Sequence, residues 1–273
     1  MAAEVADRGR PNPRRGTRER RERLAQLLAE QGSQIAFRDM QGHFDVSEAT
    51  LRRDLAALSE SGKLVRVYGG AVPARGVEST WREKAASHAE SKVRIAQFAA
   101  SELVVPGDIV FIDAGTTPAA VARQLAARTD ITIVVAGLAS LLELADGKVE
   151  VIVLGGRLRR RSASFLGQAA DHLLDLIAPD VAFLGTDFLD PANGANFPDL
   201  EQAIFKSRVI ARSARSWFVA DESKFGLSAP FRHWTRIEPP TGIVTMATTD
   251  DHEHRAIKAF RQSGSTVHEL SPA

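Results

Sequence analysis

Apolar residues in the N-terminal part of the chain recur at the spacing of short helices. Leu51, Leu55 and Leu58 stand at positions i, i+4 and i+7, which predicts a helix with one inward face. Asp45 or Ser47 offers a side-chain oxygen that would cap its first turn. Two shorter helices are predicted before it and a two-stranded hairpin after it, over residues 20–28, 37–44, 64–67 and 71–72.

The leucine stripe turns a set of polar side chains outward. Ser47 and Glu48 lie on the first turn, and Thr50, Arg52 and Arg53 follow on the outer face. Three helices with a short turn before the third are typical of a helix-turn-helix, in which the start of the last helix meets base edges. Arginine suits that role because its planar fork bonds two guanine acceptors at once. A small helical bundle with solvated arginines is the alternative, but a capped helix followed by a basic Gly-Gly hairpin favours DNA binding.

Beyond residue 84, short apolar runs alternate with helical segments. The first of these helices is expected to carry Ile95, Phe98, Ala99 and Leu103 inward. The runs are continuously apolar rather than alternating, which predicts strands buried on both faces of a mainly parallel α/β sheet. These strands are expected over residues 109–112, 131–135, 149–154, 181–184, 217–220 and 242–246.

The loop Asp113-Ala-Gly-Thr-Thr-Pro118 joins the first of these strands to a helix. Thr117 is placed to cap that helix, and proline suits its first turn. A Gly-Thr-Thr loop at the carboxyl end of a strand offers backbone N–H groups and hydroxyls to an anion. Taken alone, such a loop is equally explained as a plain tight connection.

Other polar groups follow neighbouring strands or start a helix, and together they predict a small-molecule cleft. Each of them alone is equally explained as a solvated surface residue. The candidates for this effector site are Asp113, Gly115, Thr116, Thr117, Gly155, Gly156, Glu201, Lys206, Asp221 and Lys224.

Composition narrows the possibilities without deciding among them. Residues 8–23 are rich in arginine, so residues 1–19 are expected to form a disordered basic arm. Arg20 and Arg21 follow directly after this arm. The net charge is +1, there is no cysteine, and no apolar run is long enough to span a bilayer, which suits a cytoplasmic protein. His252 and His254 are the only close histidine pair and are expected to be solvated, so neither a metal nor a cofactor is expected.

The segments Ser47-Glu-Ala-Thr-Leu-Arg-Arg-Asp-Leu55 and Gly69-Gly-Ala71, with Gly62 and Arg66, closely resemble the DNA-binding domain of the DeoR family of bacterial transcription regulators. Asp113 to Thr117, Leu154-Gly-Gly156 and Asp221 to Gly226 are similar to the sensor domain of the same family. The resemblance implies a fold similar to ribose-5-phosphate isomerase, a phosphate held by residues 115–117, and Asp113 and Lys224 lining the pocket. Ala136-Gly137 departs from the family pattern, which commonly has Thr-Asn there.

The sequence therefore predicts an α/β protein with an N-terminal winged helix-turn-helix and a C-terminal sensor domain with a mainly parallel sheet. The expected division is an arm over 1–19, a DNA-binding domain over 20–73, a linker over 74–84 and a sensor over 85–273. Gly32 and Gly62 are expected to end the first and third helices. DNA contacts are assigned to Ser47, Glu48, Thr50, Arg52, Arg53, Arg66, Arg20 and Arg21.

The function expected of this arrangement is sequence-specific regulation, most simply repression, of a carbohydrate-metabolism operon. A phosphorylated sugar or related metabolite would control it, and the protein would act as a homodimer or larger homo-oligomer on double-stranded DNA. The first alternative is a sugar-phosphate isomerase-like enzyme tethered to DNA, using residues such as Asp113 and Glu201 for proton transfer. The second is a non-specific nucleic-acid binder that uses only its arginine-rich arm.

Overall fold

The computed structural model describes residues 13–31, 35–61, 63–67, 69–73, 78–225 and 229–271 of the 273-residue chain. The chain divides into two compact units, residues 1–77 and residues 78–273. Each unit has its own hydrophobic core. The expectations for residues 1–12, Gly32, Gly62, Tyr68, residues 74–77 and Gly226 lie outside the described residues.

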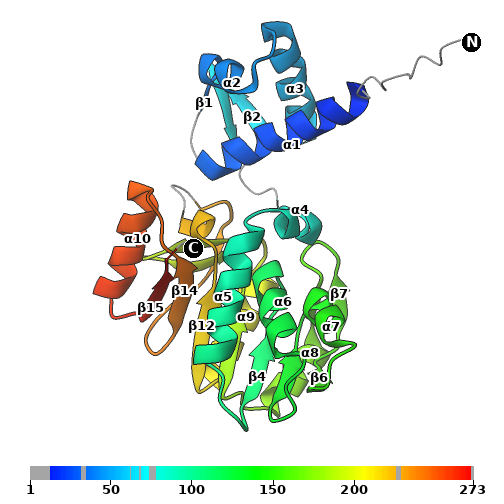
Figure 1. Ribbon diagram of the computed structural model, residues 1–273, viewed down its shortest axis with the longest axis vertical. Helices are drawn as coiled ribbons and strands as arrows, with labels where there is room; N and C mark the ends of the chain where they lie inside the picture. The colour runs from blue at the N-terminus through cyan, green and yellow to red at the C-terminus, as the bar shows by residue number, and fades with distance from the viewer. Residues whose placement is uncertain are drawn as a thin grey trace, which may run out of the picture. The chain divides into compact units, whose positions relative to one another are not determined.

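The first unit is a winged helix-turn-helix (Figure 1). Its described elements are α1 (Pro13–Gln31), β1 (Ile35–Ala36), α2 (Phe37–Phe44), α3 (Glu48–Glu60), β2 (Leu64–Val67) and β3 (Gly70–Pro73). The three strands form a small sheet in the order β1-β3-β2, with antiparallel pairing throughout. The predicted second helix and the first strand of the hairpin are confirmed residue for residue, whereas β1 was not predicted because a two-residue strand has no periodicity to detect.

The leucine stripe of α3 builds the core of this unit. Leu51, Leu55 and Leu58 are buried and pack with Leu24 and Leu28 of α1. Burial of a leucine side chain contributes about 1.5–3 kcal/mol relative to exposure, so these five side chains hold α1 and α3 together. The predicted inward face of α3 is confirmed.

Two predicted boundaries differ from the structure. Residues 13–19 are helical and not part of a disordered arm, because α1 begins at Pro13. Proline suits a first helical turn, and arginine and glutamate are good helix formers. The predicted linker is also shorter, because Glu78 is buried and α4 (Trp81–Ala86) starts within it. Thr80 and Glu83 form a reciprocal capping box at the start of α4, a signature present in the sequence but not used in the prediction.

The second unit is built on a seven-stranded sheet, as the apolar runs predicted. The strand order is β15-β14-β12-β9-β4-β5-β6, and every pairing is parallel. The strands are β4 (Ile109–Ile112), β5 (Thr132–Val135), β6 (Glu150–Val153), β9 (Val181–Leu184), β12 (Arg215–Val219), β14 (Gly242–Met246) and β15 (Val267–Leu270). Only β15 was not predicted; its residues are half-buried, so it lacks a continuous apolar run.

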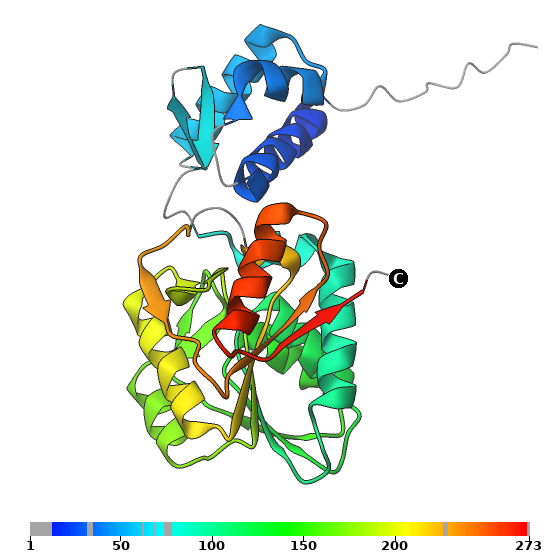
Figure 2. The same ribbon diagram turned by 90° about the vertical axis from the view of Figure 1, so that its left-hand side faces the viewer.

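Helices cover both faces of this sheet. One face packs against α5 (Ala89–Glu102), α6 (Thr116–Leu125) and α7 (Leu138–Leu144). The other face packs against α8 (Gln168–Asp175), α9 (Leu200–Arg212) and α10 (Asp251–Gln262), and Figure 2 shows the yellow α9 and the green α5 on opposite sides. No helix among the described residues is long and apolar enough to cross a membrane.

The second unit also contains several short strands and a 3₁₀ helix, η1 (Glu222–Phe225). β7 (Arg157–Arg159) pairs with β8 (Ser164–Leu166), and β11 (Gly194–Phe197) pairs with both β10 (Phe188–Asp190) and β13 (His233–Thr235). In the main sheet the chain runs outward from β4 in one direction through β5 and β6, and in the other through β9 and β12. Ligands of open parallel sheets bind at such a switch point, beyond the carboxyl ends of the strands.

Candidate DNA-binding surface and effector site

The first turn of α3 is held by the two hydroxyl side chains assigned to DNA. Ser47 caps the helix by accepting a hydrogen bond from the Thr50 backbone N–H at 3.3 Å, and its Oγ lies 2.8 Å from the Thr50 Oγ1. Ser47 is exposed and Thr50 half-buried. Both residues therefore position the helix start, at the end that meets base edges in helix-turn-helix proteins.

The adjacent arginines of α3 differ in their surroundings. Arg52 donates to Glu48 with its Nε 2.8 Å from Oε1, and its guanidinium lies 5.5 Å from the centre of the Phe37 ring. Arg53 is exposed and makes no hydrogen bond or ion pair with the residues that the structure describes. Arg53 is therefore the more available of the two for a bidentate contact with guanine.

A groove of about 610 Å³ lies along one side of α3 within the first unit. Its lining includes Arg38 at the start of α2, Glu48 and Arg52 of α3, and Arg66 of the wing strand β2. The structure thus brings three of the predicted DNA-contacting residues together around one groove. Ser47, Thr50 and Arg53 do not line it.

Arg20 and Arg21 of α1 have a structural partner that the sequence did not reveal. Their Nε atoms donate to the two carboxylate oxygens of Asp54, at 2.6 and 2.7 Å. Asp54 is only 2% exposed, so its charge requires such partners. This arrangement fastens α1 to α3, and the prediction that Arg20 and Arg21 contact DNA stays a prediction.

The loop after β4 has the geometry of an anion-binding turn at a helix start. Gly115 has a φ of +144°, a region that L side chains rarely adopt, and α6 begins at Thr116. The first helical bond runs from the Ala119 N–H to the Gly115 carbonyl at 3.0 Å, so the N–H groups of Thr116 and Thr117 precede the helical ladder. Thr117 was predicted to cap α6; it lies instead inside the first turn and is buried, because Gly115 occupies the cap position.

A buried ion pair anchors this loop. Asp113 is 1% exposed, and its Oδ2 accepts hydrogen bonds from the Lys206 ammonium and from the Gly185 backbone N–H, the latter at 2.9 Å. Lys206 comes from α9, and its ammonium also lies 5.5 Å from the centre of the Phe197 ring. Two predicted residues, Asp113 and Lys206, are thus in direct contact at the switch point between β4 and β9.

The strand next to β4 supports the loop from its other side. Ser140 of α7 donates to the Asp113 carbonyl at 3.0 Å. A Cβ at Gly137 would lie 2.6 Å from the Ala114 Cα, so the backbone after β5 packs directly on the loop. The departure from the family's Thr-Asn at 136–137 is therefore linked to an unusually close approach of two backbones.

Three of the predicted effector residues stand apart from the loop. Gly155 and Gly156 lead from the edge strand β6 into β7, and a Cβ at Gly156 would lie 2.6 Å from the Leu166 carbonyl oxygen, which explains this glycine by packing. Glu201 pairs with Arg157 of β7 at 2.5 Å, and both side chains are exposed. The structure supplies a local reason for Gly156 and for Glu201 that needs no effector.

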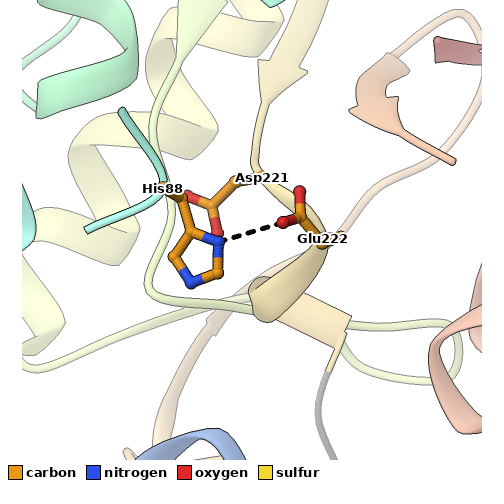
Figure 3. A group of neighbouring side chains, drawn as sticks. All are labelled: His88, Asp221 and Glu222. Carbon is orange, nitrogen blue, oxygen red and sulfur yellow. Dashed lines mark hydrogen bonds and ion pairs between the residues drawn. The ribbon is translucent and has the colours of Figure 1, made fainter. Parts of the chain in front are cut away.

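Asp221 and Lys224 join a second polar cluster, beyond the carboxyl end of β12 (Figure 3). Asp221 is fully buried and lies near His88 and Glu222. Burial raises the pKa of the Asp221 carboxyl, but the charge of Lys224 and a hydrogen bond from Ser223 outweigh it and hold the pKa below its usual value. The His88 Nδ1 lies 2.9 Å from the Glu222 Oε1, a contact that raises the pKa of the imidazole.

Lys92 of α5 is a further member of this cluster that the sequence analysis did not identify. It is 5% exposed, and its ammonium donates to the carbonyls of Lys84 and Ser87, the latter at 2.6 Å. Burial lowers the pKa of Lys92 to about 8, although Asp221 counteracts this. Lys84 in turn pairs with Asp187, which follows β9. In the sequence, nothing distinguishes this buried lysine, at helical spacing from Ile95 and Ala99, from a solvated one.

Two family models match the chain. The DeoR-like helix-turn-helix domain matches residues 20–75, and the DeoR C-terminal sensor domain matches residues 87–245. A solved ribose-5-phosphate isomerase A from Methanocaldococcus jannaschii is 17% identical, with a TM-score of 0.38 over 50% of this chain and 55% of that one.

Curated relatives are transcriptional regulators. A putative aga operon transcriptional repressor of Escherichia coli O157:H7 is 37% identical over 78% of this chain and 81% of its own. The regulator GlpR of Haloferax volcanii is 33% identical over 91% and 96%, and the glycerol-3-phosphate regulon repressor of Escherichia coli K12 is 31% identical over 84% and 94%. These relatives confirm a DNA-binding regulator rather than an enzyme. The chain belongs to the DeoR family of transcriptional regulators.

Proposed function

We propose that this regulator represses an operon for the use of a sugar or polyol and is released from its operator by a phosphorylated metabolite. The loop after β4 carries the proposal, because the backbone N–H groups of Thr116 and Thr117 precede the helical ladder of α6 at the carboxyl end of a central strand. Two relatives are named repressors, one of an aga operon and one of a glycerol-3-phosphate regulon. Helix N-termini favour phosphate because N–H groups and the helix dipole act together.

The effector is expected to bind with its phosphate at Thr116 and Thr117 and its remaining polar groups toward Asp221 and Lys224. β12 lies two strands from β4, which separates the two strand ends by roughly 10 Å at the usual spacing of about 4.8 Å per strand. That span suits a molecule of four to six carbons better than free phosphate. Gly155, Gly156 and Glu201 are not needed in this arrangement.

A thermal-shift screen of the full chain tests this site. Glycerol 3-phosphate, ribose 5-phosphate and fructose 6-phosphate would be compared with the same compounds without phosphate. A ligand present at a hundred times its Kd stabilises the folded state by about 2.7 kcal/mol. Thr116→Ala should abolish the shift, whereas Thr132→Ala, at the opposite end of neighbouring β5, should leave it unchanged. Equal shifts in both variants would place the effector elsewhere.

Sequence reading is assigned to the exposed start and outer face of α3, with Arg53 as the principal contact and Arg66 on phosphate. Arg53→Lys keeps the positive charge but removes the bidentate fork of the guanidinium. In competition binding against random DNA, this variant should show a lower preference for the operator with little loss of non-specific affinity. Arg82→Ala, which removes an arginine of the second unit, is the charge control. An operator preference unaffected by Arg53→Lys would contradict the assignment, and no preference at all would favour the non-specific alternative. Analytical ultracentrifugation with an inverted-repeat operator tests the proposed dimer.

The segment that follows the first unit connects the effector end to the rest of the chain. Glu78 is 5% exposed and takes two hydrogen bonds from Arg159 of β7, at 2.7 and 2.6 Å. Lys92 binds the carbonyls of Lys84 and Ser87 at the end of α4, next to Asp221. Residues 78–87 therefore follow any displacement at the strand ends and transmit it to the preceding unit. Glu78→Gln should reduce the effector-induced change in operator affinity, typically about 1–3 kcal/mol in coupled systems, while both separate affinities persist.

A further inference from the structure

The cluster beyond β12 contains three side chains whose atoms are typical metal ligands. His88 stands just before α5, Asp221 lies between β12 and η1, and Glu222 is the first residue of η1. One nitrogen or oxygen atom of each residue lies within 4.8 Å of the other two. Figure 3 shows the imidazole of His88 beside the carboxyl groups of Asp221 and Glu222, and His88 and Glu222 are joined by their 2.9 Å contact.

Two carboxylate oxygens in this cluster are buried without a partner among the described residues. The Asp221 Oδ1 accepts from the Ser223 hydroxyl, but the Oδ2 of this fully buried side chain accepts nothing. The Glu222 Oε2 is also buried and without a partner, although Oε1 receives His88 and, at 3.3 Å, the Ser91 hydroxyl. A buried acceptor without a donor destabilises the folded state, and does so more strongly when it is charged. Such an arrangement is incomplete without a donor or a cation.

We propose that His88, Asp221 and Glu222 bind a divalent transition cation. One imidazole nitrogen and two carboxylate oxygens form a mixed donor set that suits Mn²⁺ or Zn²⁺ better than Ca²⁺ or Mg²⁺, which prefer oxygen alone. A cation held by the three residues would supply the positive charge that these buried carboxylates lack. Three protein ligands also leave coordination positions for water or for an oxygen of a bound ligand.

Two lysines limit the affinity of this site. Lys224 and Lys92 act electrostatically on Asp221, and Lys224 also acts on His88. Their charges keep the Asp221 carboxylate ionised and ready as a ligand, but they repel a cation. We therefore expect weaker binding than at structural zinc sites. The proposal does not rest on the effector site, because it concerns ion binding by the free protein.

Titration of the full chain with Mn²⁺, followed by the electron paramagnetic resonance of the free ion, tests the proposal. One ion per chain is expected, and Glu222→Gln or His88→Ala should weaken its binding on the order of tenfold to a hundredfold or more. Asp251→Asn and His172→Ala, which remove the same kinds of group outside the cluster, should bind as the wild type does. Circular dichroism of each variant checks that it is folded.

The outcomes separate clearly. Loss of binding in both cluster variants, with binding kept in both controls, establishes the site. Absence of Mn²⁺ and Zn²⁺ binding in the wild type overturns it, as does undiminished binding in folded Glu222→Gln. Neither result affects the effector assignment, which the phosphate-dependent thermal shift and Thr116→Ala decide separately.

Discussion

Removal of the Lys206 ammonium should leave the Asp113 carboxylate buried and uncompensated. Asp113 is 1% and Lys206 5% exposed, so water cannot replace the lost partner without structural change. Removing one member of a buried ion pair typically costs about 3–5 kcal/mol. Lys206→Met is the suitable variant because methionine retains most of the apolar part of the lysine side chain and lacks its charge.

The magnitude has a measurable counterpart in thermal stability. For a domain of the size of the second unit, about 1 kcal/mol shifts Tm by about 2–4 °C, so Lys206→Met should lower it by about 6–20 °C. All three tryptophans, Trp81, Trp217 and Trp234, lie in this unit, so tryptophan fluorescence reports its unfolding selectively. Lys258→Met, on the exposed side of α10, is the matched control and should change Tm little.

A second substitution separates the pair from other effects of residue 206. In an Asp113→Asn background the carboxylate charge is absent, while the amide oxygen can still accept from the Gly185 N–H. Lys206→Met should then cost at least about 2 kcal/mol less than it does alone, which is the coupling energy of the pair. A cost below about 1 kcal/mol for the single variant, or an equal cost in both backgrounds, would refute the assignment of Asp113 and Lys206 as a stabilising buried pair.

Three further outcomes follow from local geometry. Asp54→Asn removes a buried charge that holds two arginines of α1, and should lower the protection of the α3 amides against hydrogen exchange by about 2–4 kcal/mol, with the exposed Glu60→Gln as control. Gly137→Asn restores the common family residue but places a Cβ 2.6 Å from the loop after β4, so it should destabilise the sensor by about 1–3 kcal/mol in urea titrations. Gly155→Asn, whose Cβ would meet no atom within 4 Å, should cost less, because only its φ of +68° opposes a side chain and asparagine tolerates that conformation better than most residues. Burial lowers the pKa of Lys92 from 10.5 to about 8. Between these two pH values the unfolded chain therefore binds more protons than the folded chain, so the contribution of Lys92 to the free energy of unfolding rises with pH. Lys92→Met should lose that rise, and an unchanged difference in stability between the two proteins from pH 8 to 10.5 would contradict the lowered pKa.

The main sheet was predictable because each of its central strands is apolar on both faces. Continuous runs such as Ile109–Ile112 and Val181–Leu184 are explained only by burial under helices on both sides, and the structure confirms both. Strands that are short or polar, such as Arg157–Arg159, carry no such pattern. They form because the chain is already held at both ends by neighbouring elements, which is tertiary rather than local information.

The candidate site was predictable only in part, for a similar reason. Loops at the carboxyl ends of parallel strands meet at one edge, so the placement of Asp113 and Asp221 followed from the strand assignment alone. The partners of these residues did not. Lys206 is separated from Asp113 by 93 positions, and His88 from Glu222 by 134. A single sequence contains no signal that pairs residues so far apart. The cluster around His88 was therefore not predictable, whereas the short spacing of His252 and His254 is apparent in the sequence.

The arginines of the first unit show that charge alone does not identify the residues that are available to bind DNA. Arg20, Arg21, Arg52 and Arg53 are equivalent in the sequence, and all four were assigned to DNA. In the structure the first two are bound to a carboxylate that is 2% exposed, the third is held by Glu48, and only Arg53 makes no such pair with the described residues. The Nε atoms of Arg20 and Arg21 are both used by Asp54, so displacing both arginines from it would leave a buried charge without a partner. Availability, rather than charge, is therefore the reason for which we propose Arg53 as the principal base-reading residue.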